Sequence, residues 1–368
     1  TKRDDKSIVG FNKIKFDKIN DQIQALKPND TLEVLKDTFH EHIDVKMSIH
    51  IIANPTVTIK FDAPNDVLTC SGCDVVFENI SFDYQGSGGF SAARITSGTA
   101  TYINCKFSSS DSFGVVVQNS SRATFIDCVF TNSKQSNILV EGNALITLTN
   151  CKIYGAEKFG IELTGKSAAS VSQCEINRSG SGVSIMNHAS ALFSQCKITT
   201  NRSNGFQIKS KSTNIILKSN EISNHQNDCG ILIDNSNVKL FSNKIAENQS
   251  AIQALNCSTV TTRQNNITTQ DSSYDYGFVV INKSTKFVST DDVYEGNVKY
   301  AINIGGSDSE FVGENITFKN ILIGSGFYIN PQGKIKINNC RFIDIGSYCV
   351  YTHASNDAKK SSKITIQN

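Results

Sequence analysis

The chain has 368 residues, with 36 Lys or Arg against 34 Asp or Glu, so its formal net charge is only +2. This balance gives no overall field that would attract nucleic acid or an anionic membrane surface, and we expect neither as a partner. No run of 18 apolar residues is present, which excludes insertion through a spanning helix, and no linker or charge block divides the chain into domains.

The first predicted element is an amphipathic helix over Phe16–Lys27. Ile19, Ile23 and Leu26 recur there at helical spacing, and a Pro-Asn pair follows and ends the run. A helix of this kind can cover the exposed strand edges at the end of a repeat structure, so we interpret it as a cap.

A repeat of the form Cys-x-apolar follows the first hundred residues. Its successive cysteines are 23, 23, 23 and 22 residues apart, after which Asn takes the same place. The repeated residues are Cys105, Cys128, Cys151, Cys174, Cys196, Asn220, Asn243, Asn265 and, near the end, Cys340. The spacing is looser around Asp291. A fixed period of this length is typical of a solenoid.

A second repeat runs in parallel, in which a small residue precedes alternating apolar positions. Its first apolar column is Val115, Ile138, Ile161, Val183, Phe206, Ile231, Ile252, Phe278, Ile302, Phe327 and Val350. Alternation with period two indicates strands, and a short strand that recurs once per repeat pairs with its equivalent in the next coil.

These patterns predict an all-β fold: a right-handed single-stranded parallel β-helix of about a dozen coils with an N-terminal capping helix. We assign residues 1–60 to the cap and first coil, and 61–368 to the repeats. The segment from Ile364 aligns with the segment from Ile335 and stops before the next repeated residue. We therefore expect the β-helix to continue beyond this chain, or a partner to cover its last coil in an end-to-end contact.

The eleven cysteines are interpreted as buried free thiols, because Asn serves equally well in the place that five of them share. Cys70 and Cys73 form a C-x-x-C without a second pair, so we expect no metal site. Free thiols slightly favour an intracellular protein, whereas many Asn-x-Ser/Thr sites, including Asn201 and Asn248, leave secretion open.

Two phrases of the repeat resemble a known superfamily: the ten residues from Ser121, SRATFIDCVF, and the seven from Asn204, NGFQIKS. They resemble the pectin-lyase-like superfamily, and within it the carbohydrate-binding and sugar-hydrolase type of β-helix repeat found also in F-box and spindle-associated proteins. The segment 31–53 is similar to the opening of such β-helices. The resemblance implies the fold, but one fold of this kind hosts enzymes, adhesins and scaffolds.

Four acidic residues are candidate catalytic groups. Glu141 and Glu162 lie on outward places of neighbouring coils and could form a carboxylate pair for glycoside hydrolysis or calcium binding, although two solvated glutamates are the commoner outcome. Asp291 and Asp292 are adjacent where the repeat is looser, without a His or Arg motif beside them. The calcium-binding acidic cluster of the superfamily's lyases and the Gly-His-Gly of its galacturonases are both missing.

The candidate ligand-binding residues lie on the outward places of the second repeat. Tyr328, Tyr351 and His353 form an aromatic group near the carboxyl end that could stack on a sugar ring or a partner, and Gln207 and Gln253 share the first outward column. Ordinary stacking between coils would also explain the tyrosines.

The first functional hypothesis is a non-catalytic binding or scaffold module that presents a strand face to a glycan or a protein. The alternatives are a polysaccharide lyase, hydrolase or epimerase, and a structural subunit of a larger assembly. The constant repeat favours the first, since only Tyr274–Tyr276 and Ala354–Lys363 look like loop excursions. No cofactor is expected, except calcium if the chain is a lyase.

Overall fold

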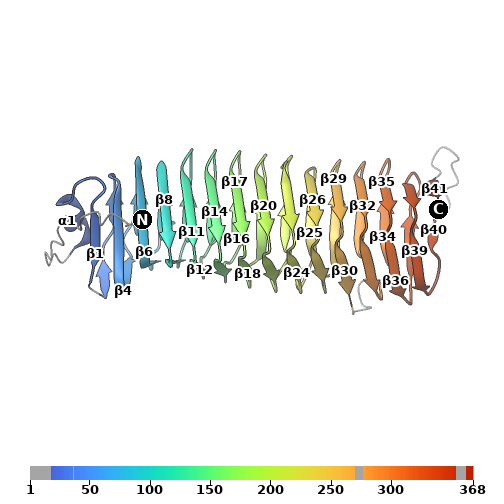
Figure 1. The fold of residues 1–368 in the computed structure, drawn as a ribbon, viewed down its shortest axis with the longest axis horizontal. Helices are drawn as coiled ribbons and strands as arrows, with labels where there is room; N and C mark the ends of the chain where they lie inside the picture. The colour runs from blue at the N-terminus through green and yellow to red at the C-terminus, as the bar shows by residue number, and fades with distance from the viewer. Residues whose placement is uncertain (1–17, 36, 270–276, 354–361, 368) are drawn as a thin grey trace, which may run out of the picture.

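The computed structural model describes residues 18–35, 37–269, 277–353 and 362–367. Its coils stack along one long axis, from the amino-terminal coils in blue to the carboxyl-terminal coils in red (Figure 1). One sheet has 14 strands and the other 27, and neighbouring coils pair in parallel throughout the described residues. The predicted parallel β-helix is confirmed.

Each coil carries strands on three faces, and the larger sheet provides two of them. Face 1 comprises β1 (Thr31–Val34), the first parts of β4 (Ile49–Phe61) and β6 (Cys73–Tyr84), β8 (Gly98–Ile103), β11 (Arg122–Ile126), β14 (Leu145–Thr149), β17 (Ala168–Ser172), β20 (Ser190–Ser194), β23 (Ile215–Lys218), β26 (Asn237–Phe241), β29 (Thr259–Arg263), β32 (Lys286–Thr290), β35 (Glu310–Glu314), β38 (Lys334–Asn338) and β41 (Lys363–Gln367).

Face 2 follows face 1 along the chain. It comprises β2 (Thr38–His40), the second parts of β4 and β6, β9 (Lys106–Ser109), β12 (Val129–Thr131), β15 (Lys152–Tyr154), β18 (Glu175–Asn177), β21 (Lys197–Thr199), β24 (Glu221–Ser223), β27 (Lys244–Ala246), β30 (Asn266–Thr269), β33 (Val293–Gly296), β36 (Thr317–Ile321) and β39 (Arg341–Ile345).

Face 3 is the smaller sheet. It comprises β3 (Ile43–Val45), β5 (Leu68–Cys70), β7 (Ala93–Ile95), β10 (Val115–Val117), β13 (Ile138–Val140), β16 (Phe159–Leu163), β19 (Ser181–Ile185), β22 (Phe206–Ile208), β25 (Cys229–Asp234), β28 (Ser250–Leu255), β31 (Val279–Asn282), β34 (Tyr300–Gly305), β37 (Ser325–Ile329) and β40 (Val350–Thr352).

The capping helix α1 is shorter than predicted, Ile19–Gln24. Ile19 and Ile23 are buried in the core, as their spacing predicted. The buried carboxylate of Glu41 accepts hydrogen bonds from the backbone N–H groups of Ile19, at 2.6 Å, and Asn20, at 3.3 Å. An acceptor at this place satisfies N–H groups that a helix leaves unpaired at its start. No helix in the described part of the chain is long and apolar enough to cross a membrane.

Aromatic stacks fill the narrow core where successive coils place rings at equivalent positions. Phe77, Tyr102 and Phe125 stack with centroid separations of 5.3 and 5.0 Å. A second stack of Phe82, Phe107 and Phe130 meets the first edge-on. Each such pair contributes about 0.5–1.5 kcal/mol beyond the burial of its area.

The corner between faces 1 and 2 explains the Cys and Asn repeat. Twelve consecutive coils turn there through a residue with positive φ, which is a polar residue that tolerates this conformation or hydrogen-bonds locally. These corner residues are Asn79, Asn104, Asp127, Asn150, Gln173, Gln195, Ser219, Ser242, Gln264, Asp291, Asn315 and Asn339. The next residue points inward, and we call this inward column the corner ladder.

The corner ladder accepts Cys and Asn because both donate to the same backbone carbonyl. The accepting carbonyl belongs to the preceding coil, to the residue three positions before that coil's own ladder residue. The Cys128 thiol donates to Tyr102 O at 3.4 Å, and the Asn243 amide donates to Leu217 O at 2.8 Å. A thiol and an amide can therefore replace each other at this place.

Around Asp291, where the spacing of the sequence repeat is looser, the strands still pair from coil to coil. Asn266 pairs with Val293, and Val293 pairs with Thr317, so Asp292 and Ile316 occupy the ladder places of their coils. Both are completely buried. The irregularity is one of residue type and spacing, and the strand pairing on face 2 continues across it in the described residues.

One prediction of register was wrong. Ile252 pairs with Val279 and not with Phe278, and Val279 and Ile281 are buried. With Phe278 in the inward column, as the sequence predicted, Val279 and Ile281 would point outward. Because strand side chains alternate, an offset of one residue after the preceding connection exchanges the two faces of β31. Tyr274–Tyr276, most of Ala354–Lys363 and the start of the predicted cap helix lie outside the described residues.

A second buried polar column lies at the corner between faces 2 and 3. Ser179 N–H donates to Asn201 Oδ1 at 3.0 Å, Asn201 N–H to His225 Nδ1 at 3.3 Å, and His225 N–H to Asn248 Oδ1 at 3.2 Å. His225 is only 1% exposed. Burial lowers the pKa of His225 from 6.5 to about 4.

We expect His225→Asn to weaken the acid sensitivity of the fold. Between pH 6.5 and about 4 the unfolded chain binds a proton that the folded His225 does not. The contribution of His225 to the free energy of unfolding is therefore complete above pH 6.5, and it falls by up to about 3 kcal/mol as the pH drops towards 4. Urea midpoints at pH 7 and 4.5 measure this change, with exposed His188→Asn as control. An equal pH response in both variants would contradict the assignment.

The cysteines of the corner ladder should resist modification. Contact with the neighbouring thiol of Cys105, followed by burial, raises the pKa of Cys128 to about 12, and the same causes act on Cys151. All eleven cysteines are free, and Cys257 and Cys349 are exposed. Iodoacetamide at pH 8 should label these two in the native chain and the ladder cysteines only after denaturation, as read by mass spectrometry. Labelling of Cys151 in the native chain would contradict the prediction.

Candidate functional site

The first outward column of face 3 holds most of the predicted ligand-binding residues. Cα pairing confirms that they stack one per coil, and Val280 is the member that β31 contributes. The column runs Val116, Leu139, Glu162, Ser184, Gln207, Leu232, Gln253, Val280, Asn303, Tyr328 and Tyr351. Its surface changes from apolar and polar residues to aromatic ones towards the carboxyl end.

Four tyrosines gather at that end and form what we call the tyrosine patch: Tyr300, Tyr328, Tyr348 and Tyr351. The ring of Tyr328 stacks on Tyr300 with centroids 4.4 Å apart and on Tyr351 at 5.6 Å, and Tyr348 lies 5.7 Å from Tyr351. The two last rings are well exposed, at 59% for Tyr348 and 39% for Tyr351. The patch therefore presents aromatic surface to solvent.

Half of this patch, Tyr300 and Tyr348, was not among the sequence candidates. Tyr300 begins β34 and pairs with Ser325, and Tyr348 lies in the corner before β40, so neither occupies the outward column. Lys299 Nζ lies 5.7 Å from the Tyr300 ring centroid. The available signal was that Tyr300 and Tyr348 each lie two residues before a member of the inward column, Ile302 and Val350, with Ser325 at the equivalent place of the coil between them.

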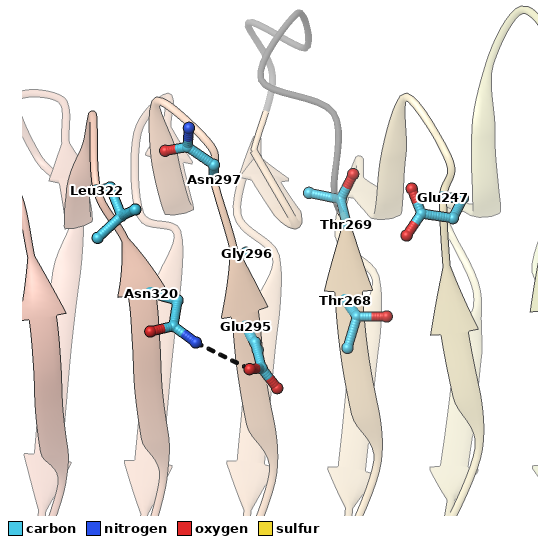
Figure 2. A pocket seen from close by; sticks show the side chains of 8 residues that line it. All are labelled: Glu247, Thr268, Thr269, Glu295, Gly296, Asn297, Asn320 and Leu322. Atoms are coloured by element: carbon cyan, nitrogen blue, oxygen red, sulfur yellow. Dashed lines mark hydrogen bonds between the residues drawn. The ribbon is translucent and has the colours of Figure 1, made fainter.

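A groove of about 520 Å³ lies where face 2 turns towards face 3, and we call it the corner groove. Figure 2 shows its lining from four consecutive coils: Glu247, Thr268, Thr269, Glu295, Gly296, Asn297, Asn320 and Leu322. Among the described residues, the lining contains two carboxylates and no Lys, Arg or His. None of these residues was a sequence candidate, because they come from several coils and from corner positions that strand periodicity does not reveal.

Glu295 is held in place within the groove. Lys319 Nζ lies 2.8 Å from Glu295 Oε2, and Asn320 Nδ2 donates to Oε1 at 2.9 Å (Figure 2). The hydrogen bond from Lys319, aided by that from Asn320, keeps the pKa of Glu295 below its ordinary value. The carboxylate is therefore ionised at neutral pH and can only accept hydrogen bonds.

Glu141 and Glu162 do not share a column. Glu162 pairs with Leu139, two residues before Glu141, and it accepts a hydrogen bond from the Ser136 hydroxyl at 2.6 Å. The two glutamates therefore lie diagonally on neighbouring coils. Their role as a catalytic pair stays a prediction.

Asp291 and Asp292 project to opposite sides of the wall. Asp291 lies outside, with Oδ2 at 3.3 Å from Arg263 Nε. Asp292 is 0% exposed; its Oδ1 accepts from Asn265 N at 2.7 Å and Nδ2 at 3.0 Å, while Oδ2 accepts from the hydroxyls of Ser289 and Thr262. Burial raises the pKa of Asp292 in spite of these bonds. The pair does not face a common ligand.

The remaining candidates lie apart or at the margin of the patch. Gln207 donates to Asn204 Oδ1 at 2.7 Å and to Ser181 Oγ at 3.1 Å, several coils before the tyrosines. Gln253 is partly buried, and His353 is exposed just after β40. Among the described residues, no group of three His, Cys, Asp or Glu side chains is placed to hold a metal ion.

A family model described as the right-handed beta helix region matches residues 91–179 and 159–323. The chain belongs to the right-handed β-helix family. No curated protein matches this β-helix in sequence.

Solved structures share the fold of this β-helix. The A-module of the mannuronan C-5 epimerase AlgE4 from Azotobacter vinelandii is 11% identical with a TM-score of 0.57, over 94% of this chain and 93% of that one. A mutant tailspike protein of E. coli bacteriophage HK620, in complex with a pentasaccharide, is 12% identical with a TM-score of 0.52, over 94% and 73%. The Agl-KA catalytic domain is 15% identical with a TM-score of 0.53, over 95% and 64%. At such identities the likeness shows the fold alone.

We expect Asp292→Ala to destabilise the β-helix by at least about 2 kcal/mol, since it leaves the buried Asn265 donors unpaired. Asp291→Asn should change stability by less than about 0.5 kcal/mol, because the side chain is on the surface and Asn tolerates positive φ. Urea unfolding followed by circular dichroism compares the two variants. Equal midpoints would show that the buried carboxylate does not stabilise the corner ladder.

Proposed function

We propose that the chain is a non-catalytic β-helix that binds a glycan through the tyrosine patch. The observation that carries the proposal is the stack of Tyr300, Tyr328 and Tyr351, whose rings continue from coil to coil on a rigid face. Aromatic side chains bury large apolar area at low entropic cost, and a sugar ring offers flat C–H surfaces to them.

The rigidity of face 3 supports this proposal. Each tyrosine-bearing strand pairs in register with its neighbour, so the spacing of the rings is fixed by the spacing of the coils, about 4.8 Å. A preformed, regular surface favours the binding of a regular ligand such as an oligosaccharide, because little conformational entropy is lost at the protein surface on binding. The tailspike relative with a bound pentasaccharide adds a general precedent for glycan binding by this fold.

The patch lacks the groups that glycoside hydrolysis needs, which supports a binding role. Hydrolysis requires one carboxyl group with a raised pKa as acid and a second one as base or nucleophile. The four rings and Lys299 provide neither, and the nearest groove carboxylate with a shifted pKa, Glu295, is shifted downward.

The test is a glycan array with the purified chain, Tyr328→Ala, Tyr351→Ala and their double variant. Tyr154→Ala, a partly exposed tyrosine on face 2, is the matched control. Each patch substitution should weaken binding about tenfold, which corresponds to about 1.4 kcal/mol, and the control should not.

A reducing-end assay on the bound glycans, with and without calcium, accompanies the array. Binding without release of reducing ends supports the proposal. Cleavage would show an enzyme, and unchanged binding by the double variant would place the glycan elsewhere.

A further inference from the structure

The corner groove and the tyrosine patch are neighbours on the surface. Asn297 lines the groove and Tyr300 begins the patch only three residues later, a distance of at most about 11 Å along an extended chain. One coil further, Leu322 lines the groove and Tyr300 pairs with Ser325. The two features are therefore the two sides of one corner.

An exposed apolar ridge joins them. Leu322 is 61% exposed and Ile323 is 57% exposed, and these are among the largest exposures of apolar side chains in the described residues. The Asn297 side chain fixes this ridge, because its Oδ1 accepts the Ile323 N–H at 3.0 Å. A ligand lying on the patch could thus continue over apolar contacts into the groove.

The groove is chemically different from the patch. Its hydrogen-bonding groups are the carboxylates of Glu247 and Glu295, the hydroxyls of Thr268 and Thr269, and the amides of Asn297 and Asn320. Such a set suits sugar hydroxyls, which donate to carboxylates and accept from amides. The Asn297 Nδ2 group makes no hydrogen bond within the described part of the chain.

The charge of the lining selects among glycans. A uronate carboxylate in the groove would meet the carboxylates of Glu247 and Glu295, and none of the described lining residues is basic. Lys319 is close, but its ammonium is bound to Glu295 at 2.8 Å. Like charges at this range disfavour an acidic ligand, whereas hydroxyl groups meet acceptors.

We infer that the corner groove is a second subsite of the glycan site and that it selects an uncharged oligosaccharide, a few units long, extending from the tyrosine patch across the Leu322–Ile323 ridge. This inference rests on the proposed glycan binding. It adds the length and the charge class of the ligand.

The experiment titrates neutral gluco-, manno- and galacto-oligosaccharides of two to six units and oligogalacturonates of the same lengths. The proteins are the wild-type chain, a double Glu295→Gln, Asn297→Ala variant, and Glu310→Gln as a matched surface carboxylate on face 1. Thermal melting checks that each variant folds. For the neutral series that binds, the six-unit ligand should bind at least tenfold more tightly than the two-unit ligand.

The groove variant should lose this gain while binding the two-unit ligand as the wild type does, and Glu310→Gln should change neither. Equal affinities for short and long neutral ligands, a groove variant that keeps the gain, or a preference for oligogalacturonates would each overturn the inference and leave the tyrosine patch standing. If the wild type binds no ligand of either series and no glycan on the array, the proposed function itself fails.

Discussion

The corner between faces 1 and 2 is the constraint on which the rest of the structure depends. One residue with positive φ turns the chain, and the next places a side chain inward, where a Cys or Asn such as Cys128 or Asn243 hydrogen-bonds to the preceding coil. This local event recurs in twelve consecutive coils, so strands before and after it come into parallel register. Once the register is set, the inward columns meet as stacks of rings and aliphatic side chains, and the outward columns become continuous stripes of surface.

The candidate site follows from the same regularity. The tyrosines at positions 328 and 351 meet because their strands pair residue by residue, and no loop is needed to bring them together. The groove depends on regularity in another way, since corner residues of four coils form its wall. A ligand that touches both features would contact successive coils along the axis of the β-helix and both sides of one corner. The described surface thus has stacked aromatic rings on one side of a corner and hydrogen-bonding groups on the other.

The sequence was informative where the physical requirement matched a residue type. Alternating Val, Ile and Phe predicted the inward strand columns, and the Cys and Asn spacing predicted the coils. The count failed at Phe278 because the connection before it has a different length, and periodicity cannot show how many residues a connection consumes. Asp292 did not stand out as a ladder residue because it is neither Cys nor Asn, whereas the fold requires only a side chain that fits the corner. The groove was invisible for a further reason: its residues share no column, and only the folded corner brings them together.

The polar part of the corner ladder has a direction along the rod. From Asn220 to Asn265, each amide donates to the ladder oxygen one coil closer to the carboxyl end, and the last of these oxygens belongs to Asp292. The side-chain dipoles are therefore aligned, with their positive ends pointing towards that aspartate. An anion is electrostatically favourable at the positive end of such a series, as it is at the amino end of an α-helix. A carboxylate can accept the last hydrogen bond of this series only at its carboxyl end, so Asp292 marks the direction of the ladder's dipole. The β-sheets themselves have only a small net dipole.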